Sequence, residues 1–239
     1  MYKKVFVLVR LAIALATLSC IALPAAAQVS DAEWERCEGA RMDSPTVLTI
    51  DERIDFCTQL IRNGHLPASK IAIIYKIRGT HYYGKTLYEN AVGDLTQAIE
   101  YDPQFADAYF WRGNAYLMEN SHDAAVADYN KAIALKPGFT AVYLSRGDYF
   151  AGLGFRDNYD PATKTRALSE YAQAISDYTR ALDLKPELGV TVGTYWSRAR
   201  AFAAIGQRDN AISDYKAALK LSPDWSPAVD GLKLLGSTP

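Results

Sequence analysis

The sequence has few of the residues from which catalytic and metal sites are built. It contains three histidines and three cysteines among 239 residues. His65, His81 and His122 show no metal-ligand spacing with one another or with the cysteines. A nucleophile elbow, a phosphate-binding loop and a paired-histidine helix are also missing from the sequence. We therefore expect a protein that is not an enzyme and that holds no cofactor and no metal.

The chain also lacks an excess of charge and a hydrophobic run long enough to cross a membrane. Its 26 basic residues nearly balance its 27 acidic ones, which excludes the strong basic excess that is typical of nucleic-acid-binding proteins. The most apolar segment, LAIALATLSCIAL at 11–23, is shorter than the roughly 20 residues that a membrane-spanning helix needs. We expect neither a nucleic-acid partner nor a membrane span in the mature protein.

The same apolar segment fits a secretory signal peptide. Lys3, Lys4 and Arg10 precede it, and alanines at 25–27 follow it. A basic start, a short apolar core and small residues at a cleavage site are the three parts of such a leader. We predict a signal peptide at 1–27 and a mature protein that is periplasmic or secreted.

A period of 34 residues organises the middle of the chain. The segments 72–105, 106–139 and 192–225 align without gaps and end near Pro103, Pro137 and Pro223. Each begins with a helical pattern of large and small residues, followed by a second one. In the first segment these are Tyr75, Gly79 and Tyr82, then Ala91, Leu95 and Ala98.

This pattern resembles the tetratricopeptide repeat family. The resemblance implies an all-α, right-handed superhelix of antiparallel helix hairpins, with four repeats over 69–225. It also implies a concave groove that binds protein segments, and no catalysis.

The third repeat, 140–188, is longer than the period because of a 15-residue insert at 155–169. Asp160 followed by Pro161 is a helix-start pattern, which predicts a second helix from about 161 to 184. The insert is either a neutral change of length at a helix turn or a second contact surface. We favour the neutral interpretation, since connections between repeats accept insertions at little cost in free energy.

The two ends read as caps of the repeat stack. Residues 28–68 contain a degenerate helical hairpin, and residues 226–239 contain a capping helix and a tail. The outer repeats need such caps, because one face of each outer repeat has no neighbouring repeat to cover it. The hairpin holds Cys37 and Cys57, the two cysteines that follow the predicted leader. We predict that they form a disulfide, since the protein is expected to be exported and two packed helices can bring such side chains within reach. Two buried free thiols are the alternative.

An arginine near the middle of each first helix has an aspartate at a fixed distance in the sequence. The pairs Arg78 and Asp94, Arg112 and Asp128, and Arg198 and Asp214 are each 16 residues apart, and Arg146 and Asp177 are 31 apart, which is 16 plus the insert. The spacing indicates an ion pair between a first and a second helix. We interpret the arginines as structural joints rather than as ligand-binding groups.

The remaining face of each first helix is the predicted partner-binding site. Its positions lie two residues before the arginine, and two and five after it, together with a tryptophan beside the second repeat's first position. These residues are Lys76, Thr80, Tyr83, Phe110, Trp111, Asn114, Leu117, Leu144, Asp148, Ala151, Trp196, Arg200 and Ala203. Aromatic side chains with flanking charges suit a peptide segment. The alternative is that Phe110, Trp111 and Trp196 are core residues.

The groove residues do not favour the family's clamp for a C-terminal carboxylate. Lys76 and Asn114 match that clamp, but Thr80, Leu144 and Asp148 depart from it, and Asp148 would repel a carboxylate. We expect a non-enzymatic scaffold that binds a protein or peptide in the periplasm. The alternative functions are a carrier of a small molecule or glycan and an enzyme subunit whose chemistry belongs to its partner.

Overall fold

The computed structural model describes residues 31–38, 48–62, 66–158 and 162–238, and all regular structure in these ranges is helical. The predicted all-α class is confirmed, while the predicted signal peptide at 1–27 lies outside the described residues. The helices are α1 (Asp31–Glu38), α2 (Ile50–Arg62), α3 (Ala68–Gly84), α4 (Tyr88–Tyr101), α5 (Ala106–Met118), α6 (His122–Leu135), α7 (Thr140–Asp157), α8 (Lys164–Asp183), α9 (Leu188–Ala204), α10 (Arg208–Leu221) and α11 (Ser226–Leu234).

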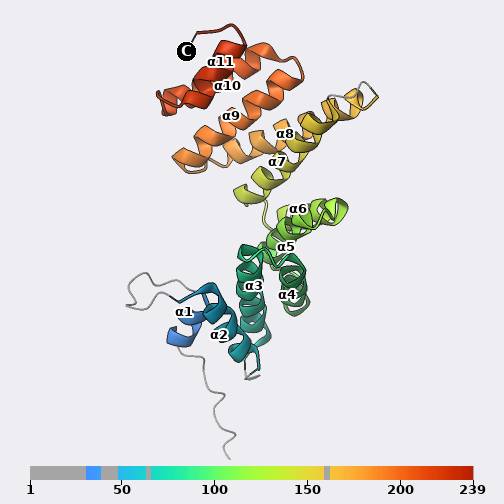
Figure 1. Ribbon diagram of the computed structural model, residues 1–239, viewed down its shortest axis with the longest axis vertical. Helices are drawn as coiled ribbons and strands as arrows, with labels where there is room; N and C mark the ends of the chain where they lie inside the picture. The colour runs from blue at the N-terminus through green and yellow to red at the C-terminus, as the bar shows by residue number, and fades with distance from the viewer. Residues whose placement is uncertain (1–30, 39–47, 63–65, 159–161, 239) are drawn as a thin grey trace, which may run out of the picture.

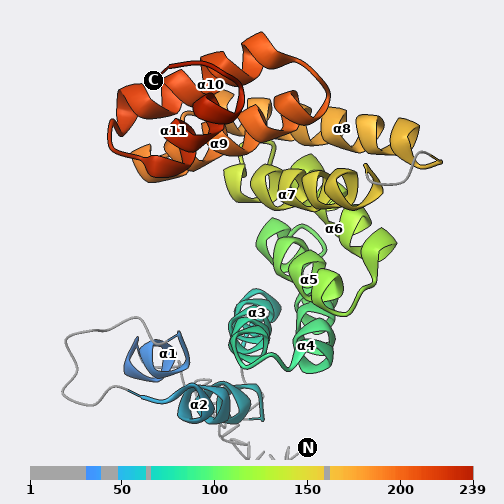
Figure 2. The same cartoon turned by 45° about the horizontal axis from the view of Figure 1, so that its top comes forward.

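The helices form a stack of hairpins in chain order. The pairs α3–α4, α5–α6, α7–α8 and α9–α10 each pack as a hairpin, and each second helix also contacts the first helix of the next pair. The stack runs along the long axis of the molecule, with α1 and α2 at one end and α11 at the other (Figures 1 and 2). Each helix thus buries its apolar face against its neighbours in the chain.

Glycines allow the two helices of a hairpin to approach closely. A Cβ atom placed on Gly79 would lie 2.9 Å from Leu95, and one on Gly113 would lie 2.9 Å from the Tyr129 ring. Such distances are too short for carbon atoms in contact, so a larger residue would force the helices apart. The small residues of the repeat pattern therefore set the distance between paired helices.

In the regular repeats, the second residue after the end of each first helix lies in the left-handed region. Thr86, Asn120 and Gly206 share one position of the period and have φ angles of 61°, 60° and 79°. The N–H group of the following residue donates to a carbonyl in the last turn, for example from Leu87 to Tyr82 at 3.0 Å. This is a Schellman-type helix end, which satisfies a carbonyl that the helix itself leaves free.

The insert in the third repeat lengthens both helices of the hairpin. α7 has 18 residues and α8 has 20, against 13 and 14 in α5 and α6. α8 begins at Lys164 rather than at 161, and the predicted cap at Asp160 and Pro161 lies outside the described residues. Within the insert Asp157 and Ala167 are buried. The described residues of the insert therefore extend α7 and form the start of α8 (Figure 2), and most of their other side chains are exposed.

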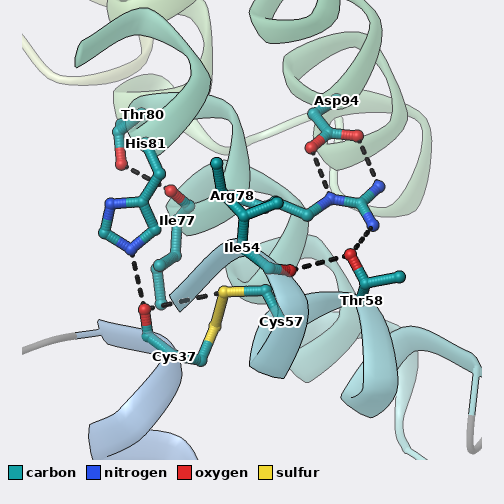
Figure 3. Close-up of a disulfide and its surroundings, with 9 residues drawn as sticks. All are labelled: Cys37, Ile54, Cys57, Thr58, Ile77, Arg78, Thr80, His81 and Asp94. Atoms are coloured by element: carbon teal, nitrogen blue, oxygen red, sulfur yellow. Dashed lines mark hydrogen bonds and ion pairs between the residues drawn. A yellow bond between two sulfur atoms is a disulfide. The ribbon is translucent and has the colours of Figure 1, made fainter. Parts of the chain in front are cut away.

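A disulfide joins the first two helices, as predicted. Cys37 on α1 and Cys57 on α2 are bonded, with their Cα atoms 4.9 Å apart. Both are fully buried in a cluster with Ile74 and Ile77 of α3, and Figure 3 shows the bond beside Ile77. The N-terminal hairpin is thereby crosslinked and packed onto the first regular repeat.

None of the helices in the described ranges is both long and apolar enough to cross a membrane.

Candidate functional site

Each of the four arginines connects three helices. Arg78 on α3 donates from Nε and Nη2 to the two carboxylate oxygens of Asp94 on α4, both at 2.7 Å. Its Nη1 donates to the hydroxyl of Thr58 on α2 at 2.9 Å (Figure 3). The guanidinium therefore holds its own second helix and the second helix of the preceding pair.

The same joint recurs along the stack. Arg112 bridges Asp128 and Thr96, Arg146 bridges Asp177 and Asn130, and Arg198 bridges Asp214 and Thr179. The four aspartates are 4 to 7% exposed. A buried carboxylate needs a hydrogen-bonded counter-charge, because burial without one is unfavourable by several kcal/mol.

Aromatic rings complete the setting of these arginines. The Tyr75 and Tyr82 rings flank the Arg78 guanidinium, with ring centres at 5.4 and 5.9 Å. Burial lowers the pKa of Arg78, but the hydrogen bonds and charge of Asp94 outweigh that effect and leave the pKa raised. All three nitrogens of each guanidinium donate within the fold, so these arginines are joints in the stack.

The predicted partner-binding residues occupy equivalent positions on α3, α5, α7 and α9. We call the following nine the first-helix surface, because each is half-buried or exposed: Lys76, Thr80, Tyr83, Asn114, Leu117, Leu144, Asp148, Trp196 and Arg200. Ala151 and Ala203 beside them are half-buried.

One predicted binding residue belongs to the core instead. Phe110 is 9% exposed, and its ring lies 5.1 Å from Phe139 and 6.3 Å from Tyr129 between ring centres. It fills the space where α5 and α6 meet the start of the next repeat, so the prediction that it faces a ligand is wrong. Trp111 is half-buried and packs edge-on against Tyr83 at 5.6 Å, on the side of the preceding repeat.

Two tyrosines on second helices reach the first-helix surface, and the sequence interpretation missed them. The Tyr129 hydroxyl donates to the side-chain oxygen of Asn114 at 2.6 Å, and the Tyr178 hydroxyl donates to Asp148 at 2.7 Å. Both rings are buried, and burial raises the pKa of each phenol well above its usual range. Both hydroxyls are therefore protonated donors at neutral pH. Their recurrence at one position of the period, with Tyr215 in the fourth repeat, was the available signal.

Asp148 and Arg200 are the charged members of this part of the surface. Asp148 is exposed, yet the protein around its carboxyl raises its pKa through desolvation, and the Tyr178 hydrogen bond partly offsets that effect. The Arg200 guanidinium lies over the Trp196 ring at 4.6 Å, and that ring packs edge-on against Trp225 at 6.0 Å. Among the residues that the structure describes, Asp148 and Arg200 have no ion-pair partner.

Two hollows lie outside this surface. One of about 710 Å³ is lined mainly by the Arg78 joint and its flanking tyrosines, and a smaller one of about 350 Å³ lies between the start of α9 and the end of α10. In the described part of the chain no three histidine, cysteine, aspartate or glutamate side chains are placed to hold a metal ion.

The repeats match a known family. Two family models with the description "Tetratricopeptide repeat" match residues 78–138 and 192–224. The chain is a tetratricopeptide repeat protein. No curated protein sequence shows significant similarity to it.

Solved tetratricopeptide repeat structures share its fold. MamA superposes with a TM-score of 0.60 at 22% identity, covering 74% of this chain and 91% of MamA. PilF of Pseudomonas aeruginosa gives 0.57 at 18%, covering 71% and 69% of the two chains. PilW, a type IV pilus biogenesis factor, gives 0.53 at 20%, covering 69% and 68%. At these identities the likeness shows the fold alone.

Proposed function

We propose that this tetratricopeptide repeat protein is a non-enzymatic scaffold that binds a segment of a partner protein on the first-helix surface. The fold uses four arginines and four aspartates as internal joints, yet it leaves Asp148 and Arg200 without ion-pair partners in the described chain. That contrast carries the proposal. A half-buried Trp196 beside Arg200 supplies an aromatic anchor of the kind that dominates binding free energy at protein interfaces.

We further propose that the protein acts in the bacterial periplasm. Two features support this location: the leader pattern at 1–27 and the buried disulfide. Disulfides persist in oxidising compartments and are rare in the cytosol.

Affinity capture from an envelope extract of the source bacterium tests the proposed function. The protein is compared with a variant that carries Trp196→Ala and Lys76→Glu, and with a control that carries Lys131→Glu on the exposed side of α6. We expect a stoichiometric protein partner that the first variant loses and the control keeps. Co-purification of a small molecule without any protein would contradict the proposal and indicate a carrier. Circular dichroism melting of each variant confirms that it is folded.

A further inference from the structure

Asp148 differs from the four joint aspartates in the hydrogen bonds that its carboxylate accepts. Asp94, Asp128, Asp177 and Asp214 each accept two hydrogen bonds from an arginine. Asp148 accepts one, from the neutral hydroxyl of Tyr178. A carboxylate has about four acceptor positions, so Asp148 keeps both its charge and most of its hydrogen-bonding capacity available on an exposed surface.

Arg200 is the complementary group on the next first helix. It occupies on α9 the position that Asp148 occupies on α7, two residues after the joint arginine in each case. Its guanidinium stacks on Trp196 and is exposed. Stacking orients the flat face of a guanidinium and leaves its N–H groups at the edge free to bind a carboxylate.

The two opposite charges stay apart although they belong to adjacent repeats. The Tyr178 hydroxyl, which donates to Asp148, is near enough to Arg200 for the arginine charge to act on its pKa. No ion pair joins Asp148 to Arg200 among the described residues. The surface therefore presents a negative group on α7, bonded to the Tyr178 hydroxyl, and a positive group on α9.

We propose that Asp148 binds a lysine or arginine side chain and that Arg200 binds an acidic side chain of the same partner segment. This inference rests on the proposed function and deepens it by naming the chemistry of the ligand. α7 and α9 contact each other directly, packed helices lie about 8 to 10 Å apart, and an extended chain advances about 3.3 Å per residue. The two charged residues of the ligand are therefore about three positions apart, with the basic one opposite α7 and the acidic one opposite α9.

Charge complementarity favours this occupant over a free C-terminus. A terminal carboxylate bound over α7 would lie beside Asp148. Two negative charges side by side at an interface are unfavourable by several kcal/mol. A basic side chain gains an ion pair at the same place. The tryptophan beside Arg200 adds apolar contact for the aliphatic part of the acidic residue or for its neighbour.

Selection from a display library of random 12-residue peptides tests the inference. The target is the protein purified from the periplasm of an expression host, and parallel selections use Asp148→Arg, Asp148→Asn and Arg200→Glu. Asp183→Arg is the matched control, because this exposed aspartate is the last residue of α8 and is not one of the residues of the first-helix surface. Asp148→Asn keeps an acceptor for Tyr178, so a folded variant is available even if the charge reversal disturbs α7.

On the unmodified protein and on the control we expect peptides with a basic and an acidic residue about three positions apart. Their affinity should fall about tenfold or more for Asp148→Arg, and selection on that variant should replace the basic residue by an acidic one. Binders that Trp196→Ala abolishes but that show no charge preference would overturn this inference and leave the proposed function standing. If no peptide bound to the first-helix surface, the inference and the proposed function would both fail.

Discussion

At the scale of single residues, the same side-chain types, arginine and aspartate, serve both as joints inside the fold and as charged groups on the first-helix surface. A joint arginine is enclosed by a carboxylate, a hydroxyl or amide and aromatic rings, and its aspartate is buried. Among the described residues, Asp148 has only the Tyr178 phenol as a hydrogen-bond partner, and it stays exposed. The number of hydrogen-bond partners within the fold therefore separates structural charges from charges that are free to bind a ligand.

Replacing one joint arginine should destabilise the whole stack. Arg112→Ala leaves the 6% exposed Asp128 carboxylate without its counter-charge, and we expect the free energy of unfolding to fall by about 3 kcal/mol. Urea denaturation followed by circular dichroism measures this change. The double variant Arg112→Ala with Asp128→Ala should recover part of the loss, because the unpaired charge is then absent. An unchanged midpoint for the single variant would contradict the joint.

A strained helix end offers a stabilising change. Thr86 has a φ angle of 61° and is exposed, and the left-handed region is unfavourable for such a residue by about 1 to 2 kcal/mol. Thr86→Gly removes that strain, although glycine loses about 0.5 to 1 kcal/mol more backbone entropy on folding. We expect a net gain of up to about 1 kcal/mol in the free energy of unfolding. The control Thr86→Ala keeps a Cβ atom and should give no such gain; equal gains from both would disprove the explanation.

At the scale of helices, the N-terminal hairpin depends on the disulfide. α1 has eight residues, and an isolated helix of that length is unstable in water. The crosslink closes a loop of 20 residues between Cys37 and Cys57.

Removing this bond should lower the free energy of unfolding by about 3 kcal/mol. The double variant Cys37→Ala with Cys57→Ala shows the loss by denaturation, and a reducing agent should lower the melting temperature of the unmodified protein but not that of the variant. Intact mass after alkylation of unfolded, unreduced protein gives an independent check. Two alkylated thiols in protein from the periplasm would rule out the bond.

His81 makes the docking of this hairpin sensitive to pH. Its Nε2–H group donates to the Cys37 carbonyl at 2.7 Å (Figure 3). Burial lowers the pKa of His81 below 6.5, the cations Arg53 and Lys76 lower it further, and the hydrogen bond opposes them. The unfolded chain therefore binds a proton first as the pH falls below about 6.5, and stability falls with it.

Between about pH 7 and about pH 5.5, the melting temperature of the unmodified protein should drop. We expect the melting temperature of His81→Gln to drop by less over the same range. Glutamine keeps a donor for the Cys37 carbonyl but does not titrate, and the other titrating groups are common to both proteins. Identical pH profiles would show that His81 does not contribute.

The helix level also shows what the sequence could predict and where it failed. The spacing of small and large residues predicted the hairpins, and the 31-residue separation of Arg146 and Asp177 predicted a contact that survives the insert. Phe110 was misplaced because helical spacing assigns a side chain to a face, whereas its burial depends on how closely the next repeat approaches. Phe139 from the following repeat covers it, and no local pattern encodes that distance.

The predictions for the insert and for the two tyrosines failed for related reasons. A helix-start pattern at 160 and 161 was readable, but the pairing of Asp157 on α7 with Arg166 on α8 depends on how two lengthened helices meet. Tyr129 and Tyr178 were not identified from the sequence, because a tyrosine that packs by its ring also has a polar end. Its hydroxyl reaches the opposite side of the hairpin only because Gly113 and Gly147 let the ring lie flat against the first helix.

At the scale of the whole molecule, the repeats form a one-dimensional stack whose joints are internal and whose first-helix surface keeps free functional groups. Stability in such a stack is close to a sum of repeat and neighbour contributions. Changes on the first-helix surface should therefore alter binding without unfolding the chain, whereas changes at the joints should do the reverse. The central claim is that a partner protein binds on the first helices and not on the second.

Site-specific photo-crosslinking in living cells of the source organism tests that claim most directly. A benzophenone amino acid is placed at Leu117 or Leu144 on the first-helix surface, and at Ala127 or Lys131 on the exposed side of α6 as a matched control. The account predicts a discrete adduct of higher mass, containing one partner protein, from the first two positions and none from the control positions. Adducts from the α6 positions alone would contradict it.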